Sequence, residues 1–330
     1  MDAPLTDSDA SPAGEMRPPT PPAPPTPTRK NGLAFFAIVL ALYGLLGTLT
    51  QMASPLLGLA WSEVFALLLP AFVAAAGSNL NPVRALLLTR RPSVSALALA
   101  LLIGVAGFFA AGAIMELTSI ALPARWLQIF DVSKLFERPP LERAALSVAA
   151  ATVAPFCEEV AFRGWLLTAL RTRCRTGPAI ALSAVLFAAM HLDPVRFSAL
   201  VALGVLYAWM TWRSGSVWPA ILAHATNNVL GVALTTSDAG TNLDATRPLT
   251  AQLVGVALLT LALAGCVLSL LAMAYRRVAP APPPIGDALV RRDPAEESTA
   301  FRFGRVPAGQ LAAIGAAGFS LAVLLLTHRR

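Results

Sequence analysis

The stretch APFCEEVAFRGW, residues 154–165, decides the fold because it places three charges inside an apolar run. Between residues 144 and 170, the only charged side chains are those of Glu158, Glu159 and Arg163. An apolar run of about 20 residues is long enough to cross the hydrocarbon core of a bilayer. The stretch therefore predicts a transmembrane helix that carries buried charges.

The composition extends this interpretation to the whole chain of 330 residues, which is 56% hydrophobic and 13% charged. A soluble domain carries about 25% charged residues, so half of the usual solvating surface is missing. We expect an all-α protein, a polytopic transmembrane helix bundle of about eight or nine spans. The expected spans cover residues 33–52, 57–77, 93–115, 143–170, 178–192, 196–212, 217–234, 250–275 and 308–327.

The segments outside the main block of spans have their own composition. Residues 1–31 are rich in proline and predict a disordered cytoplasmic tail. Residues 33–90 hold the N-terminal transmembrane helices, and residues 117–140 predict an amphipathic segment at the outer interface. Two further transmembrane helices are expected at 250–275 and 308–330, with a proline-rich cytoplasmic loop at 278–307 between them.

The basic residues that give the net charge of +7 cluster at the ends of apolar runs. This distribution is typical of cytoplasmic loops under the positive-inside rule. It predicts a multi-pass protein of the cell membrane with a cytoplasmic N-terminus, and it argues against nucleic acid as a partner. The three cysteines, Cys157, Cys174 and Cys266, have no metal-ligand spacing and imply no disulfide framework.

The two adjacent glutamates differ in their helical neighbours. Glu159 and Arg163 are i and i+4 with the acid first, which favours an ion pair. Glu158 points about 100° away around the helix, and no basic residue follows it at that spacing. A charge near the bilayer centre costs roughly 2.5–3.5 kcal/mol, so such groups are functional candidates. Glu158 is a candidate general base; the alternative is a fully paired network that only holds helices together.

Two of the three histidines lie within other spans, each with a companion one turn away. Phe187 and His191 occur in FAAMH, and His224 and Asn228 occur in HATNN. With a rise of about 1.5 Å per residue, these polar side chains reach depths similar to that of Glu158. The spacing predicts that residues from three separate spans line one cavity.

The three motifs together resemble a known family. E-E-x-x-x-R, F-x-x-x-H and H-x-x-x-N occur here in the order found in the CPBP family, which comprises CAAX prenyl proteases and bacteriocin-processing or self-immunity proteins (the Abi domain). The resemblance covers residues 90–235, which would form the intramembrane protease core. It implies an intramembrane glutamate protease that uses no metal or other cofactor.

The resemblance also implies a role for each matching residue. Water would be activated by Glu158 and His191, the oxyanion would be held by His224 and Asn228, and the geometry of the site would be supported by Glu159, Arg163 and Phe187. The implied substrate is a peptide or a membrane protein within the lipid bilayer, with or without a prenyl group.

Two other interpretations remain open at this point. Two histidines and a carboxylate can hold catalytic zinc, which would make the chain a zinc-dependent intramembrane metalloprotease at Glu158, His191 and His224. The sequence lacks the H-E-x-x-H pattern that places two ligands on one helix face. The second alternative is a non-catalytic membrane scaffold or self-immunity protein, against which the intact motifs argue.

Overall fold

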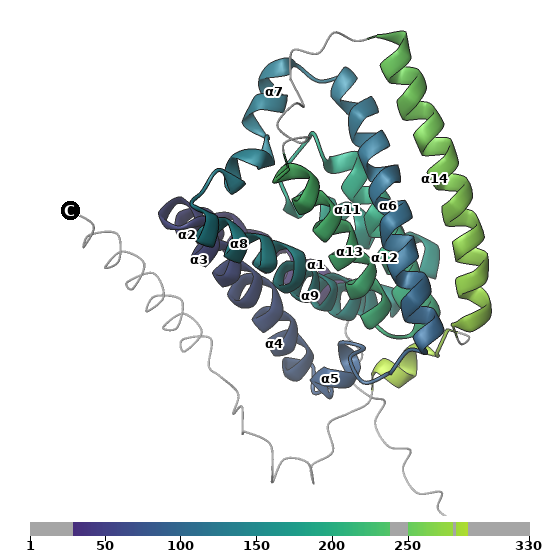
Figure 1. The fold of residues 1–330 in the computed structure, drawn as a ribbon. Helices are drawn as coiled ribbons and strands as arrows, with labels where there is room; N and C mark the ends of the chain where they lie inside the picture. Colours follow the sequence, from purple (N-terminus) through teal and green to yellow (C-terminus); the bar gives the residue numbers. More distant parts are fainter. Residues whose placement is uncertain (1–28, 238–249, 280–281, 290–330) are drawn as a thin grey trace, which may run out of the picture.

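The computed structural model describes residues 29–237, 250–279 and 282–289 (Figure 1). Within these residues every regular element is a helix, which confirms the predicted all-α class. The predicted span at 308–327, almost all of the tail at 1–31 and most of the loop at 278–307 lie outside the described residues.

The first half of the described chain contains short helical segments, several of them joined end to end. In chain order they are α1 (Arg29–Leu42), η1 (Tyr43–Gly47), α2 (Thr48–Ala53), α3 (Pro55–Trp61), η2 (Ser62–Leu68), α4 (Leu69–Gly77), α5 (Pro82–Ala85), α6 (Val94–Ile120), α7 (Ala124–Ile129) and η3 (Val132–Phe136).

The second half contains the segments with the candidate site residues. They are α8 (Pro140–Val148), η4 (Ala149–Val153), α9 (Ala154–Glu159), η5 (Val160–Leu166), α10 (Leu167–Arg171), α11 (Thr176–Met190), α12 (Phe197–Ser214), α13 (Trp218–Thr235), α14 (Ala251–Val278) and η7 (Ile285–Ala288).

Five helical stretches among the described residues are long and apolar enough to cross a membrane. They are Lys30–Ala53, Pro55–Gly77, Val94–Ile120, Pro140–Arg171 and Ala251–Val278. These match five of the predicted spans. Three other predicted spans correspond to the shorter helices α11, α12 and α13, of 15, 18 and 18 residues.

The segment at 117–140, predicted to be interfacial, is divided among several elements. The long helix α6 continues through Ile120, and α7 and η3 follow as separate short helices. Figure 1 shows α7 at the end of the bundle opposite α5. Pro139 and Pro140 then begin the next long stretch, where a proline at the first helical position leaves no donor unpaired.

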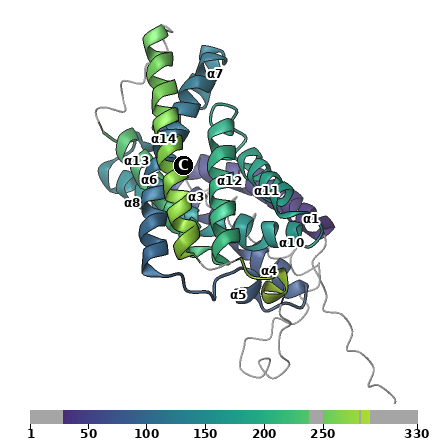
Figure 2. The ribbon, with the colours of Figure 1, turned by 90° about the vertical axis from the view of Figure 1, so that its right-hand side faces the viewer.

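The long helices pack in two groups. Figures 1 and 2 show α6, α12 and α14 side by side, and α13 packs against α6, α12 and α9. One hydrophobic cluster, with Ile103 and Tyr275, joins α6, α12, α13 and α14. The other, with Leu67, Trp165 and Phe187, joins the first two spans to η5 and α11. The candidate site residues lie where these two clusters meet.

Local signals at the helix ends explain several boundaries. Ser93 accepts a hydrogen bond from the amide of Ala96 at the start of α6, and Thr250 accepts one from Leu253 at the start of α14. Such side chains satisfy donors that have no partner inside the helix. Gly215, with a φ of +68°, ends α12 in the left-handed conformation that glycine adopts without strain.

Basic segments gather at one end of the bundle. The Ser216 hydroxyl donates to the carbonyl of Arg90 at 2.8 Å, and the Arg213 guanidinium donates to the carbonyl of Arg276 at 2.6 Å. The first contact joins the turn after α12 to the loop before α6, and the second joins the C-terminal ends of α12 and α14. The basic residues that the sequence predicts on one side of the membrane therefore include a group that is also close in space.

Candidate active site

The glutamate-bearing helix α9 lies between two π-helical segments. η4 precedes it and η5 follows it, so the stretch Pro140–Arg171 is helical throughout but irregular around the two acids. Pro155, in the first turn of α9, cannot donate a backbone hydrogen bond, which is consistent with the irregular turn before it. π-Helical turns change which side chains share a helix face and often occur at functional sites.

The ion pair predicted from the i,i+4 spacing is present. The Arg163 Nη1 atom lies 2.9 Å from Glu159 Oε1, and both side chains are fully buried. The guanidinium also donates to the backbone carbonyl of Gly204 on α12 at 3.4 Å. It lies over the ring of Phe187, 4.2 Å from the ring centre. Arg163 therefore ties η5 to both α11 and α12.

His224 lies between the two carboxylates. Its Nδ1 atom is 2.9 Å from Glu159 Oε1, and its Nε2 atom is 3.7 Å from Glu158 Oε2. The ring of Tyr207 stacks on the imidazole, with ring centres 5.0 Å apart and planes inclined by 21°. A buried carboxylate, an aromatic face and helix α13 thus fix the orientation of this histidine.

Glu158 differs from Glu159 in its hydrogen bonding. Both side chains are buried, but Glu159 Oε1 accepts from Arg163 and His224. Glu158 Oε2 has no hydrogen-bond partner among the described residues, and its nearest ionic neighbour is His224 at 3.7 Å. Glu159 Oε2 likewise has no hydrogen-bond partner among the described residues. The two acids therefore differ in that Oε1 of Glu159 binds both Arg163 and His224, whereas Glu158 has only the longer contact with His224.

His191 is held at the C-terminal end of α11. Its Nδ1 atom lies 2.9 Å from the carbonyl of Phe187, a geometry in which Nδ1 donates and Nε2 is left as the acceptor of a neutral ring. Leu192 follows with a φ of +50°, which turns the chain out of the helix. The Phe187 ring contacts both histidine rings, with ring centres 4.9 Å apart for His191 and 6.0 Å apart for His224. Phe187 is therefore the link between them.

Asn228 lies one turn beyond His224 on α13. Its side-chain nitrogen donates to the carbonyl of Ala150 in η4 at 3.0 Å. An asparagine amide carries two N–H donors, so one remains for another acceptor. The neighbouring Asn227 donates to Asn228 Oδ1 at 3.4 Å.

The structure brings most of the predicted site residues into one contact network, although Glu158 and His191 share no direct hydrogen bond among the described residues. Joined through hydrogen bonds, ion pairs and ring contacts are Glu158, Glu159, Arg163, Phe187, His191 and His224. Asn228 is attached to the backbone of η4 and lies beside this network.

Three polar residues near the site are absent from the sequence prediction. Tyr207 stacks on His224, and Tyr43 donates to the fully buried Glu63 at 3.4 Å. Tyr207 carries no signal in the sequence, because a tyrosine in an apolar helix is common. Glu63 does carry one, since it is the only charged residue between 55 and 77.

The donor groups of the site do not converge as metal ligands. Among the described residues, no group of three His, Cys, Asp or Glu side chains is arranged to hold a metal ion. Cys157, next to the glutamates, is a buried free thiol, as expected for a small packing residue.

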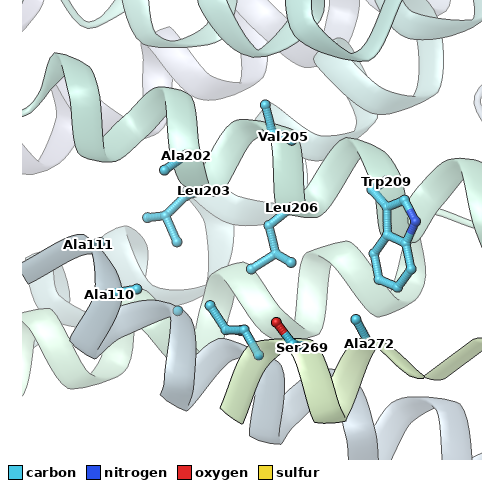
Figure 3. Close-up of a pocket in the computed structure, with 11 residues that line it drawn as sticks. Ala110, Ala111, Ala202, Leu203, Val205, Leu206, Trp209, Ser269 and Ala272 are labelled. Atoms are coloured by element: carbon cyan, nitrogen blue, oxygen red, sulfur yellow. The ribbon is translucent and has the colours of Figure 1, made fainter. Parts of the chain in front are cut away.

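An apolar pocket of about 330 Å³ lies between α6, α12 and α14, away from the glutamates (Figure 3). Gly107, Leu203, Trp209 and Ser269 are among its lining residues. None of the predicted catalytic residues lines this pocket. The candidate chemistry therefore lies in the polar network and not in this pocket.

An all-helical membrane protein with a buried network of acids, histidines and amides has the features of an intramembrane hydrolase. Residues 140–230 match the family model described as Rce1-like, type II CAAX prenyl endopeptidase Rce1-like. The match identifies this segment as an Rce1-like CAAX protease domain, in agreement with the resemblance of the three motifs. The family indicates an endopeptidase of the CAAX protease type that acts within the membrane.

The match includes every predicted site residue but leaves residues 1–139 and 231–330 uncovered. No curated protein and no solved structure matches the chain.

Proposed function

We propose that this protein is an intramembrane glutamate endopeptidase in which Glu158 and His191 activate the attacking water. The observation that carries the proposal is the difference between the two neighbouring acids. Among the described residues Oε2 of each acid lacks a hydrogen-bond partner, but Oε1 of Glu159 binds Arg163 and His224. Glu158 has only a 3.7 Å contact with His224, so its free Oε2 belongs to a carboxylate that no cation engages closely. A general base needs such a free oxygen to take a proton.

In the proposed reaction, the oxygen of water attacks the carbonyl carbon of the scissile peptide bond. Its proton passes to Glu158, the carbon–nitrogen bond then breaks, and the leaving amine takes up a proton. His191 would assist through Nε2, because its Nδ1 is already bound to the carbonyl of Phe187. Glu159, Arg163 and Phe187 support the site by holding His224 and α11 in place.

His224 and Asn228 would stabilise the negative oxygen of the tetrahedral intermediate. The second N–H of Asn228 is available beside the one that binds Ala150. The carboxylates of Glu158 and Glu159 flank His224 and stabilise a positive charge on its ring. A preorganised donor of this kind is worth about 2.7–4 kcal/mol in the transition state.

The substrate proposed is a peptide or membrane protein, with or without a prenyl group, cut without metal or any other cofactor. The protein would lie in the cell membrane as a multi-pass protein with a cytoplasmic N-terminus. Support for this orientation comes from the loop at Arg90 and the ends of α12 and α14, whose basic residues share one end of the bundle.

Comparative proteomics of membranes from wild-type and Glu158→Ala cells would test the proposal. We expect peptides cut in the wild type to persist uncut in the variant, and purified wild-type protein to cut them in the presence of a chelator. Identical peptide populations would contradict a protease role. Activity that is lost to a chelator and restored by zinc, with stoichiometric zinc in the active protein, would instead support the metalloprotease alternative.

A further inference from the structure

The carbonyl of Ala150 receives no hydrogen bond from the backbone of its own helix. Ala150 lies in the π-helical segment η4, in which the amide of Ala154 donates to the carbonyl of Ala149, five positions earlier. In the same register the donor to Ala150 would be the amide of residue 155, which is a proline and has no N–H. In an α-helical register the donor would be the amide of Ala154, which is already bound to Ala149. Neither register therefore supplies a donor to this carbonyl.

The side chain of Asn228 supplies the donor instead. Its Nδ2 atom donates to the carbonyl of Ala150 at 3.0 Å, from helix α13 to segment η4. In a membrane helix, side chains of neighbouring helices commonly bind the backbone groups that a proline frees. The contact is therefore the counterpart of Pro155: the residue that removes one donor lies on one helix, and the residue that replaces it lies on another.

This contact fixes the orientation of the Asn228 amide. One N–H is bound to Ala150, and Oδ1 accepts from the Asn227 side chain at 3.4 Å. If the amide turned over, its Oδ1 atom would face the carbonyl of Ala150, and two acceptors would then meet without a proton between them. The second N–H of Asn228 is thus left for another acceptor, in a direction that the first N–H determines.

The anchor of Asn228 belongs to the same helical stretch as the proposed general base. Segment η4 leads directly into α9, which carries Glu158. Helix α13 contacts this stretch at two points, through His224 at 3.7 Å from Glu158 and through Asn228 one turn further on. A bond to Ala150 therefore holds the Asn228 amide in a fixed place relative to both residues.

We propose that Pro155 is a positioning residue for Asn228. Because it has no N–H, it leaves the carbonyl of Ala150 free to hold the amide that stabilises the oxyanion. With any other residue at this position, a backbone N–H would compete for that carbonyl and release the Asn228 side chain to other rotamers. The inference rests on the proposed function, in which Asn228 is an oxyanion donor, and it gives Pro155 a role beyond bending the helix.

The experiment uses the full-length protein in detergent and a fluorogenic peptide that spans a cleavage site found in the proteomic comparison. It compares Pro155→Ala, Asn228→Ala and the double variant. Pro140→Ala is the matched control, because Pro140 lies in the first turn of α8 as Pro155 does in α9, but it is exposed. A further variant, made by cell-free synthesis, carries lactic acid at position 155, whose ester linkage has neither an N–H nor a proline ring.

Pro155→Ala adds a competing donor, so we expect kcat to fall by about 3- to 10-fold with KM unchanged, the effect of one lost hydrogen bond. Its melting temperature should not fall, because the new amide gains a partner within the helix. Asn228→Ala should lower kcat by about 10²- to 10³-fold. The double variant should be no slower than Asn228→Ala, since no amide is left to position. The lactic acid variant should restore the wild-type rate, and Pro140→Ala should keep it.

Several results would overturn the inference while Asn228→Ala is impaired. A wild-type kcat in Pro155→Ala would show that an N–H at this position does not compete with Asn228. An equal loss from Pro155→Ala in the presence and absence of Asn228 would show that the two residues act independently. A lactic acid variant as slow as Pro155→Ala would assign the effect to the ring, and a fall in kcat that follows the loss of folded protein would indicate a structural role. If Asn228→Ala cuts at the wild-type rate, the proposed oxyanion role fails, and the inference with it.

Discussion

The stretches Pro140–Arg171 and Ala251–Val278 are both long enough to cross a bilayer, yet they meet very different surroundings. In the most apolar part of the first, 61% of the residues are buried inside the protein, against 11% in the second. The first carries Glu158, Glu159 and Arg163 together, and the second has its charges at its last turn. The helix richer in charge is the one more enclosed by protein.

This difference shows how a membrane protein can keep ionised groups. Lipid offers no hydrogen-bond partners, so charged side chains are stable at depth only where other helices supply them. Around Arg163 and His224, helices α11 and α12 supply a carbonyl and two aromatic rings, and Glu159 on α9 supplies a carboxylate. α14 packs mainly on α6 and turns leucines such as Leu263 outward.

Removing the proposed general base from the enclosed helix should have the largest effect. Glu158→Gln should lower the cleavage rate by about 10²- to 10⁴-fold, the range of a lost general base, with no loss of folded protein. Glu159→Gln should retain more activity and lose more stability, because Arg163 and His224 both bind its oxygen. Peptide cleavage and thermal unfolding in detergent measure the two effects. Equal activity losses at unchanged folded yield would contradict this division of roles.

Breaking the buried ion pair should have the next largest effect. Arg163→Gln leaves Glu159 buried without its cation, which should reduce the free energy of unfolding by about 3–5 kcal/mol. Arg125→Gln, at an exposed position on α7, should change it by less than about 0.5 kcal/mol. Adding Glu159→Gln to the first variant should recover part of the loss, since no charge then remains unpaired. No recovery would mean that Arg163 acts through its packing on Phe187 and Tyr207 rather than through its charge.

Much of this fold could be predicted from composition and pattern. The apolar runs predict the bounds of the five longest helical stretches, and most of these bounds are correct to within a few residues. This is possible because length and hydrophobicity are local properties of the chain. The π-helical turns around α9 and in η2 could not be predicted, because a π-turn is set by how neighbouring helices pack. The same holds for the break of the segment after α6 into two short helices.

The site divides in the same way. The Glu159–Arg163 pair could be predicted because both residues lie on one helix, one turn apart. The hydrogen bond from His224 to Glu159 joins residues 65 positions apart, and spacing within a helix says nothing about it. Sequence reasoning placed the three motifs at one depth, but only the fold brings Tyr207 onto His224. Glu63 could have been identified from the sequence, because a charged residue inside an apolar span is a functional candidate. The same rule identified Glu158 in the fourth span.

Leucine-to-alanine substitutions in the stretches Pro140–Arg171 and Ala251–Val278 test the difference in their burial without changing any charge. Leu167 is 1% exposed in α10, and Leu263 is 59% exposed in α14. Leu167→Ala should leave a cavity and reduce the free energy of unfolding by about 2–5 kcal/mol. Leu263→Ala should change it by less than about 0.5 kcal/mol. Similar losses on unfolding in the same detergent would show that α14 has a protein partner that the fold of one chain does not supply.

The close contact between α6 and α13 gives the smallest effect. A Cβ atom built on Gly104 in α6 would lie 2.5 Å from the carbonyl oxygen of Ala223, the residue before His224 on α13. One at Gly112 on the same helix would meet nothing within 4 Å. Gly104→Ala should therefore force the helices apart, lower the free energy of unfolding by about 1–3 kcal/mol and slow cleavage. Gly112→Ala should raise it by up to about 1 kcal/mol, because alanine favours the helix, and leave cleavage unchanged. If Gly104→Ala proves as stable and as active as Gly112→Ala, the position of α13 against α6 does not hold His224 in place.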